Sequence, residues 1–189
     1  GLGLGGLGRL TLQRLGVGTT RLGRRLERAL QQSTLLRVSI GAERSPVTDG
    51  QVTEAALRAC DSVITFRRRL ASGTGPASPV AGMLQLLLRD PINPRSIAFQ
   101  LQRLAEALEL VAPDPLEEVV ETVREATGRI ATLDLPALME DDRSGLLVEL
   151  EQLDGTLRRA HTDIEERYFT RKASQHSVQT VSWTDGVAW

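Results

Sequence analysis

Arginine and acidic side chains occur in clusters that could bind an anion or hold helices together. Arg24, Arg25 and Arg28 surround Glu27 at the margin of an apolar helical stripe, and three further arginines stand at residues 67–69. An arginine can form two parallel hydrogen bonds with one carboxylate or phosphate group. The clusters are interpreted either as solvated helix surfaces or as semi-buried Glu–Arg pairs that hold an anionic ligand or lock helix register.

The other residues that could carry chemistry do not form a recognisable site. His161 precedes Glu165 by one helical turn, but a histidine at the edge of an apolar stripe is more often a core-edge residue than a metal ligand. Cys60 is the only cysteine, which excludes a thiolate zinc site. The glycines of residues 1–8 match G-x-G-x-x-G, but a dinucleotide site also needs a preceding strand and a parallel sheet. We expect no metal ion, no cofactor and no catalytic residue in this chain alone.

Length and composition favour one globular domain. The chain has 189 residues, of which 41% are hydrophobic and 25% charged. A net charge of −1 argues against nucleic-acid binding as the main function, and no apolar run is long enough to span a membrane. We recognise no signal peptide, and the single cysteine fits a reducing compartment. We therefore expect a cytoplasmic protein without nucleic-acid or membrane partners.

Apolar residues recur at helical spacing along most of the chain. This pattern predicts an all-α fold: a helical bundle of five long helices plus short ones, with antiparallel neighbours. The long helices are expected over residues 19–40, 49–70, 94–111, 116–130 and 144–168, and shorter ones over 80–88 and within 133–140. Three regions follow from this pattern: a glycine-rich, poorly ordered lead-in over 1–18, the bundle over 19–169, and a polar tail over 170–189.

Capping residues and prolines predict where the helices begin. Asp49 is expected to cap the second long helix. Asn93 should cap the third, with Pro94 at its first position, where the missing N–H of proline costs no hydrogen bond. Asp114 and Pro115 repeat this arrangement before the next helix.

Three charged segments carry a family resemblance. They are residues 22–29 (Leu-Gly-Arg-Arg-Leu-Glu-Arg-Ala), 61–69 (Asp-Ser-Val-Ile-Thr-Phe-Arg-Arg-Arg) and 89–101 (Arg-Asp-Pro-Ile-Asn-Pro-Arg-Ser-Ile-Ala-Phe-Gln-Leu). Together they resemble the alpha-E family, a bacterial helical domain named for its Glu-Arg motif, and residues 166–169 are similar to the family's last helix. The resemblance runs from about Leu15 to Phe169. It covers the C-terminal half of the family's usual domain, so we expect a part of a longer protein.

The resemblance implies a module that accompanies circularly permuted ATP-grasp ligases, either fused to them or encoded nearby. The leading hypothesis is a non-catalytic accessory or substrate-presenting domain for ATP-dependent amide-bond formation, with a peptide substrate as a second partner. The alternatives are an enzyme domain that acts on peptide or amide substrates through the Glu-Arg motif, and a structural bundle that completes a larger fold. The positions that match the family's motifs are candidate structural or binding residues: Glu27, Arg28, Asp61, Arg67, Asp90, Arg95 and Arg167.

The Glu-Arg motif further suggests a clamp between helices. Glu27 adjoins Leu26 and Leu30 of the apolar stripe, so we expect helix packing to bury much of its side chain. A buried carboxylate needs a cation as a partner. Arg28 points about 100° away from Glu27 around the helix, so the two should pair with other helices and not with each other. The expected partners are Arg67, Arg95 or Arg167 for Glu27, and Asp61 or Asp90 for Arg28.

Overall fold

The computed structural model describes residues 4–41, 44–72, 78–111 and 116–175. Within these ranges the chain is helical and has no strand, which confirms the predicted all-α class. The α-helices are α1 (Leu4–Ile40), α2 (Pro46–Ala59), α3 (Val63–Ala71), α4 (Pro79–Leu84), α5 (Ile97–Val111), α6 (Glu117–Thr132), α7 (Leu135–Leu138) and α8 (Ser144–Gln175). A π-helical turn, Gln85–Arg89, extends α4, and a 3₁₀ turn, Asp141–Arg143, precedes α8.

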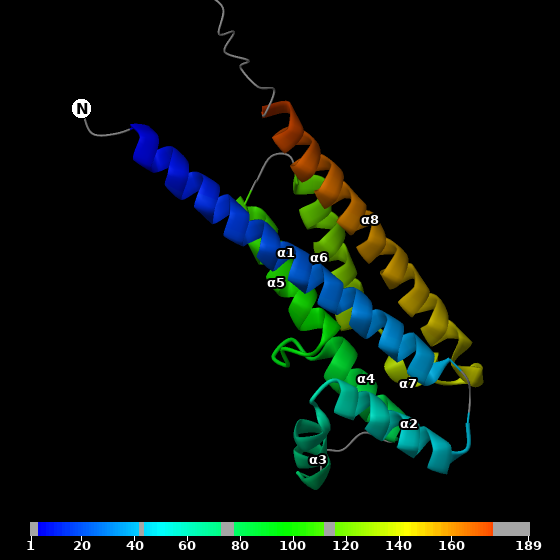
Figure 1. Ribbon diagram of the computed structural model, residues 1–189. Coiled ribbons are helices and arrows are strands. Elements are labelled where there is room, and N and C mark those ends of the chain that lie inside the picture. The colour runs from blue at the N-terminus through cyan, green and yellow to red at the C-terminus, as the bar shows by residue number, and fades with distance from the viewer. Residues whose placement is uncertain (1–3, 42–43, 73–77, 112–115, 176–189) are drawn as a thin grey trace, which may run out of the picture.

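Four long helices form the body of the bundle. α1 packs against α5 and α8, and α6 also packs against α5 and α8, so the four helices close a ring in the order α1–α5–α6–α8. Neighbours in this ring run antiparallel, which is clearest for α1 and α8 in Figure 1. The shorter helices α2, α3, α4 and α7 gather at the end of the bundle where α1 ends and α8 begins (Figure 1).

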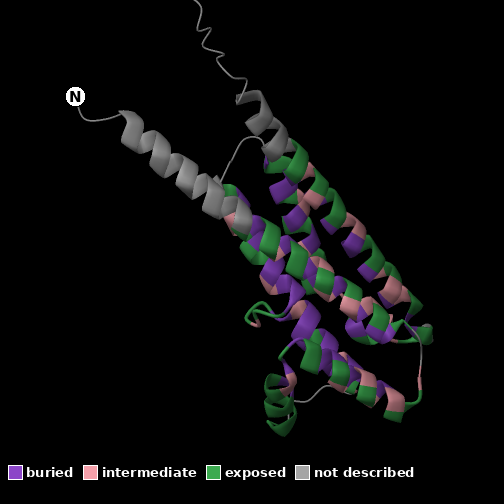
Figure 2. Ribbon diagram, in the orientation of Figure 1, coloured by how far each residue is buried: buried purple, intermediate pink, exposed green. Residues whose placement is uncertain are grey.

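The predicted apolar stripes form the core between these helices, and Figure 2 shows buried residues along their inner sides. On α5 the stripe of Ile97, Leu101, Leu104 and Leu108 is fully buried. The buried members on the other three helices are Leu22, Leu26, Ala29, Leu36 and Ile40 on α1; Val120, Val123, Ala126 and Ile130 on α6; and Leu146, Leu150, Leu153, Leu157, Ala160 and Ile164 on α8. Burying one large aliphatic side chain contributes about 1.5–3 kcal/mol, so this seam is the main source of stability.

The first helix begins before the position expected from the sequence. The segment over residues 1–18 is expected to lead into a helix that starts at Thr19, whereas α1 starts at Leu4. The segment contains no proline, and a glycine weakens a helix by only about 1 kcal/mol, so it holds no strong stop signal. Of the expected tail, residues 170–175 belong to α8. The rest of the tail and the expected start at 114–115 lie outside the described residues.

One predicted helix is divided in two. The apolar pattern predicts a continuous helix over residues 49–70, but α2 and α3 separate at residues 60–62. Asp61 adopts a left-handed conformation with a φ of 50°, and its N–H donates to the Arg58 carbonyl at 3.0 Å. The following N–H donates to the Leu57 carbonyl at 2.8 Å, which completes a Schellman arrangement that ends α2. α3 consequently turns away from the core, with a single buried side chain.

The predicted cap of α2 is wrong. Ser45 is the N-cap, since its Oγ accepts the Thr48 N–H at 3.3 Å, and Pro46 lies in the first turn. Asp49 lies inside the helix, where it is buried and pairs with Arg143 from the turn before α8. Arg143 Nη1 donates to Asp49 Oδ1 at 3.1 Å and Nη2 donates to Oδ2. This bidentate contact joins α2 to the start of α8, two segments far apart in the chain.

The cap of α5 also differs from the one expected. Ser96 is the cap, because its Oγ accepts the Phe99 N–H at 3.0 Å. Asn93 shapes the preceding turn: its Oδ1 accepts the Arg95 N–H at 3.1 Å, and its amide donates to a buried carbonyl of the π-helical turn. Pro94 accordingly lies in that turn and not at the first helical position. Both Asn and Ser are good capping residues, so the local sequence does not decide between them.

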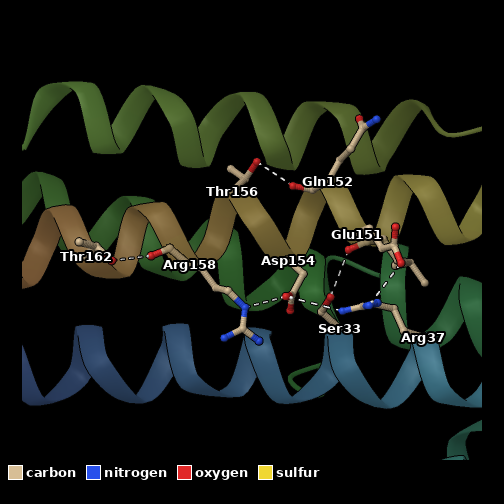
Figure 3. Close-up of polar contacts among 9 residues, drawn as sticks. Ser33, Arg37, Glu151, Gln152, Asp154, Thr156, Arg158 and Thr162 are labelled. Carbon is tan, nitrogen blue, oxygen red and sulfur yellow. Dashed lines mark hydrogen bonds and ion pairs between the residues drawn. The ribbon is translucent and has the colours of Figure 1, made fainter.

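A second polar contact joins α1 to α8 along the body of the bundle (Figure 3). The buried carboxylate of Asp154 on α8 lies between two arginines: Arg158 Nε is 2.7 Å from Oδ2, and Arg37 Nη1 is 3.7 Å from it. Asp154 Oδ1 and Arg37 Nε are buried without a hydrogen-bond partner among the described residues. A partly satisfied ion pair stabilises less than a fully bonded one, so this contact is weaker than Asp49–Arg143.

The two candidate caps of α5 can be separated by amide hydrogen exchange. In Ser96→Ala, the Phe99 N–H loses its acceptor, so its exchange should accelerate and the free energy of unfolding should fall by about 1 kcal/mol. In Asn93→Ala, exchange should accelerate at Arg95 and stay unchanged at Phe99. Equal acceleration at Phe99 in both variants would contradict Ser96 as the cap.

Urea denaturation should show which carboxylate holds the helices together. Asp49→Asn leaves Arg143 buried without its counterion, and removing one partner of a buried pair costs about 3–5 kcal/mol. Glu27→Gln is the matched control, because Glu27 is exposed and removal of an exposed charge costs less than about 1 kcal/mol. Equal losses in the two variants would show that the Asp49–Arg143 contact does not support the fold.

Candidate functional site

A small pocket lies where the end of α2 meets α1 and the beginning of α5. Its volume is about 210 Å³. The polar side chains that line it are Arg28, Gln31, Gln32, Cys60, Arg95 and Gln100. These residues lie within, or no more than three residues from, the three charged segments singled out in the sequence, 22–29, 61–69 and 89–101. The fold therefore brings all three segments to one place.

Two guanidinium groups give the pocket its charge. Arg95 Nη2 lies 3.0 Å from Oδ2 of Asp61, the residue whose left-handed conformation ends α2. Both side chains of this pair are largely exposed, so the pair orients Arg95 and adds little stability. Arg28 is exposed and forms no ion pair with any residue that the structure describes. The pocket thus offers one oriented guanidinium and one that is available to an anion.

A buried amide forms one wall of the pocket. Gln100 is 1% exposed, and its Nε2 donates to the Pro94 carbonyl at 2.5 Å. Its Oε1 accepts from Arg25 Nη1 at 3.2 Å. Gln100 therefore connects the turn before α5 to α1 and holds the backbone next to Arg95 in place.

Cys60 contributes a neutral thiol. Burial raises the pKa of the Cys60 thiol, whose Sγ donates a hydrogen bond to Gln32 Oε1 at 3.3 Å. A thiol becomes a nucleophile only as the thiolate, so a raised pKa makes Cys60 unreactive near neutral pH. Its role in the pocket is to fill space beside Gln32.

Positive charge extends from the pocket along α1 and α5. The pKa of Arg25 is lowered, first by burial and then by the positive charges of Arg103 and Arg28. Arg25 and Arg103 also lie over the ring of Phe99, 5.8 and 5.3 Å from its centroid. An arginine stays charged in spite of such a shift, so the surface beside the pocket is a local concentration of positive charge.

Glu27 does not form the predicted clamp. It is exposed and has no ion-pair partner among the described residues. It faces an open hollow between α1 and α8, which is also lined by Arg158 and His161, and not the pocket that contains Arg28. The margin of an apolar stripe is covered only if a neighbouring helix extends over it, and at Glu27 none does. The buried clamps use Asp49 and Asp154 instead.

The remaining candidates are dispersed. Arg67 pairs with Glu54 on the surface between α2 and α3, at 2.9 Å. Asp90 is buried, accepts the Ile92 N–H at 2.9 Å and pairs with Arg69, so it organises the turn before α5. The side chain of Arg167 lies outside the described residues. Of the seven candidates, the structure brings Arg28, Asp61 and Arg95 together. The expected partner of Arg28 was Asp61 or Asp90, but Asp61 pairs with Arg95 and Asp90 with Arg69.

Sequence reasoning missed Gln31, Gln32 and Gln100, the three amides of the pocket. Gln100 lies within the segment 89–101, but nothing in its spacing distinguishes it from a solvent-facing glutamine. Gln32 is one turn after Arg28 on α1, a spacing that places the two on the same helix face. That spacing is the one local signal that could have identified Gln32.

The described ranges contain neither a candidate metal centre nor a candidate membrane span. No group of three or more His, Cys, Asp or Glu residues there could hold a metal ion. None of the helices in these ranges combines the length and the apolar character that a membrane span requires.

Comparison with known proteins identifies the family. Residues 10–169 match the model of the Alpha-E family, described as a predicted alpha-helical domain with a conserved ER motif. Relatives include uncharacterized proteins of Mycobacterium bovis and of two strains of Mycobacterium tuberculosis, each 31% identical over 146 residues. The match covers 77% of this chain but only 16% of each relative. No solved structure matches the chain. The chain belongs to the Alpha-E family.

Proposed function

We propose that this chain is a non-catalytic accessory domain that presents a peptide substrate to an ATP-grasp amidoligase. The observation that supports this proposal is the convergence of Arg28 and Arg95 on one pocket, from segments far apart in the chain. Paired guanidinium groups recognise carboxylates and phosphates. A ligase that forms amide bonds from peptides acts on substrates that carry carboxylates, so the chemistry of the pocket suits the substrate.

The pocket's size argues that it holds one group and not a whole ligand. Its volume of about 210 Å³ is below the roughly 300–1,000 Å³ of most small-molecule sites. A terminal carboxylate fits such a space, while the remainder of a peptide would lie across the positive surface of α1 and α5. Binding of this kind holds a peptide by one end and leaves the rest accessible to a partner enzyme.

The lining of the pocket favours binding over catalysis. General acid–base or nucleophilic catalysis needs a group whose pKa lies near the working pH, next to a base or an acid. The pocket's thiol has a raised pKa, and its other described polar side chains are arginines and amides, which do not exchange protons near neutral pH. The enzymatic alternative therefore has no support at this pocket.

Binding of a peptide carboxylate is the first test. N-acetyl-Ala-Ala with a free carboxylate should perturb the NMR signals of Gln32 and Gln100, and Arg28→Gln should weaken its binding about tenfold. The amidated peptide, which lacks the charge, should not bind. Arg124→Gln is the matched control, because Arg124 is an exposed arginine on α6 outside the pocket. Binding that is equally strong in Arg28→Gln would refute the carboxylate pocket, and inorganic phosphate that binds more tightly than the peptide would identify a phosphate site instead.

The second test concerns the partner. The protein, reconstituted with the partner ATP-grasp ligase that the proposal requires, should lower that ligase's KM for the peptide and leave kcat unchanged. Arg28→Gln should raise that KM about tenfold, because the pocket contributes binding and takes no part in the chemical step. A loss of kcat without a change in KM would favour the enzymatic alternative. No effect of the domain on either constant would favour a purely structural role.

A further inference from the structure

A larger pocket lies between α6 and α8. Its volume is about 350 Å³, within the range of small-molecule sites. Its floor is apolar and includes Ile130 of α6 and Leu153 of α8, both buried. Charged, hydroxyl and amide side chains of the same two helices also line it, together with Leu88 and Leu133 from outside these helices.

This pocket is separate from the candidate site. The ring order α1–α5–α6–α8 places the α6–α8 seam opposite the α1–α5 seam. The smaller pocket with Arg28 adjoins α1 and the start of α5, and the two pockets share no lining residue. A ligand in the α6–α8 pocket therefore does not depend on the proposed function.

One pair of charges in the pocket is already satisfied. Arg129 of α6 lies 2.9 Å from a carboxylate oxygen of Glu149 on α8, and it also donates to Gln152 Oε1. These contacts connect the two helices across the seam. Arg129 and Glu149 therefore act as part of the wall, and neither is available to pair with a ligand of opposite charge.

Two other charges in the lining are exposed to solvent and have no ion-pair partner among the described residues. Glu125 of α6 has no cation within ion-pair distance in the described part of the chain. Arg159 of α8 likewise has no carboxylate partner there, and its Nη2 donates only to Thr156 Oγ1, at 3.2 Å. Glu125 does not pair with Arg129 one turn later, because Arg129 reaches across to α8. One free anion and one free cation thus line the same hollow above an apolar floor.

From this arrangement we infer that the α6–α8 pocket binds a small zwitterion, a free amino acid or short peptide with both termini unblocked and an apolar side chain. Glu125 binds the ammonium group, Arg159 binds the carboxylate, and the side chain covers the floor near Ile130 and Leu153. A ligand with both charges satisfies both residues at once. A singly charged ligand leaves one of them unpaired.

The probe for this site is the dipeptide Ala-Leu with free termini, titrated into the protein and followed by NMR. Signals of residues that line the α6–α8 pocket should shift. Glu125→Gln and Arg159→Gln should each weaken binding about tenfold, which corresponds to the loss of one charge-assisted contact. N-acetyl-Ala-Leu and Ala-Leu amide lack one charge each, so the signals of the α6–α8 pocket should report about tenfold weaker binding of either one to the unaltered protein.

Matched controls separate this site from the other pocket. Glu117→Gln removes an exposed carboxylate of the same helix outside the pocket, and Arg28→Gln alters only the α1–α5 site, so neither should change Ala-Leu binding at α6–α8. If the lining signals do not shift at millimolar Ala-Leu, the inference is wrong. It is also wrong if only one of Glu125→Gln and Arg159→Gln weakens binding, because a zwitterion site requires both. N-acetyl-Ala-Ala binding at Arg28 tests the proposed function independently.

Discussion

The packing of apolar stripes between α1, α5, α6 and α8 is the interaction on which the rest of the molecule depends. Each stripe is completely or almost completely buried, and each helix contacts two neighbours in the ring. The long helices, held in place by this packing, in turn position the short helices and turns that are connected to them at one end of the bundle. The candidate pocket is made there, from α1, the break between α2 and α3, and the turn before α5.

Buried charge is the second constraint, and it sets how the outlying segments attach. A buried carboxylate is tolerated only when a cation and hydrogen bonds satisfy it. Asp49 and Asp90 meet this requirement through arginines from other segments, and each thereby ties one loop or helix to another. Glu27, the acidic residue of the Glu-Arg pair at residues 27–28, is under no such constraint because it is exposed. Its exposure leaves it able to contact something outside this chain.

The two pockets suit different tasks because of how their charges are satisfied. At the smaller pocket, Asp61 orients Arg95, and Arg28 remains available, so the net charge favours a single anionic group. At the α6–α8 pocket, Arg129 and Glu149 satisfy each other and leave one charge of each sign. The two proposed sites, one for an anion and one for a zwitterion, lie on opposite seams and together suit peptide-like molecules.

Local sequence determined the helical class, the core stripes and most helix positions. The reason is that apolar residues recur with the 3.6-residue period of a helix, and this spacing shows which face of each helix is buried. It also identified the charged segments that meet at the candidate pocket. Tertiary structure decided where helices are interrupted, which of two suitable residues acts as a cap, and which charges are buried. The sequence predicts that Asp49 is a helix cap and that Glu27 is a buried clamp residue. Whether each carboxylate is buried depends on a distant part of the chain, because Arg143 pairs with Asp49 and no helix covers Glu27. A contact between residues far apart in the chain leaves no periodic signal in the sequence near either of them.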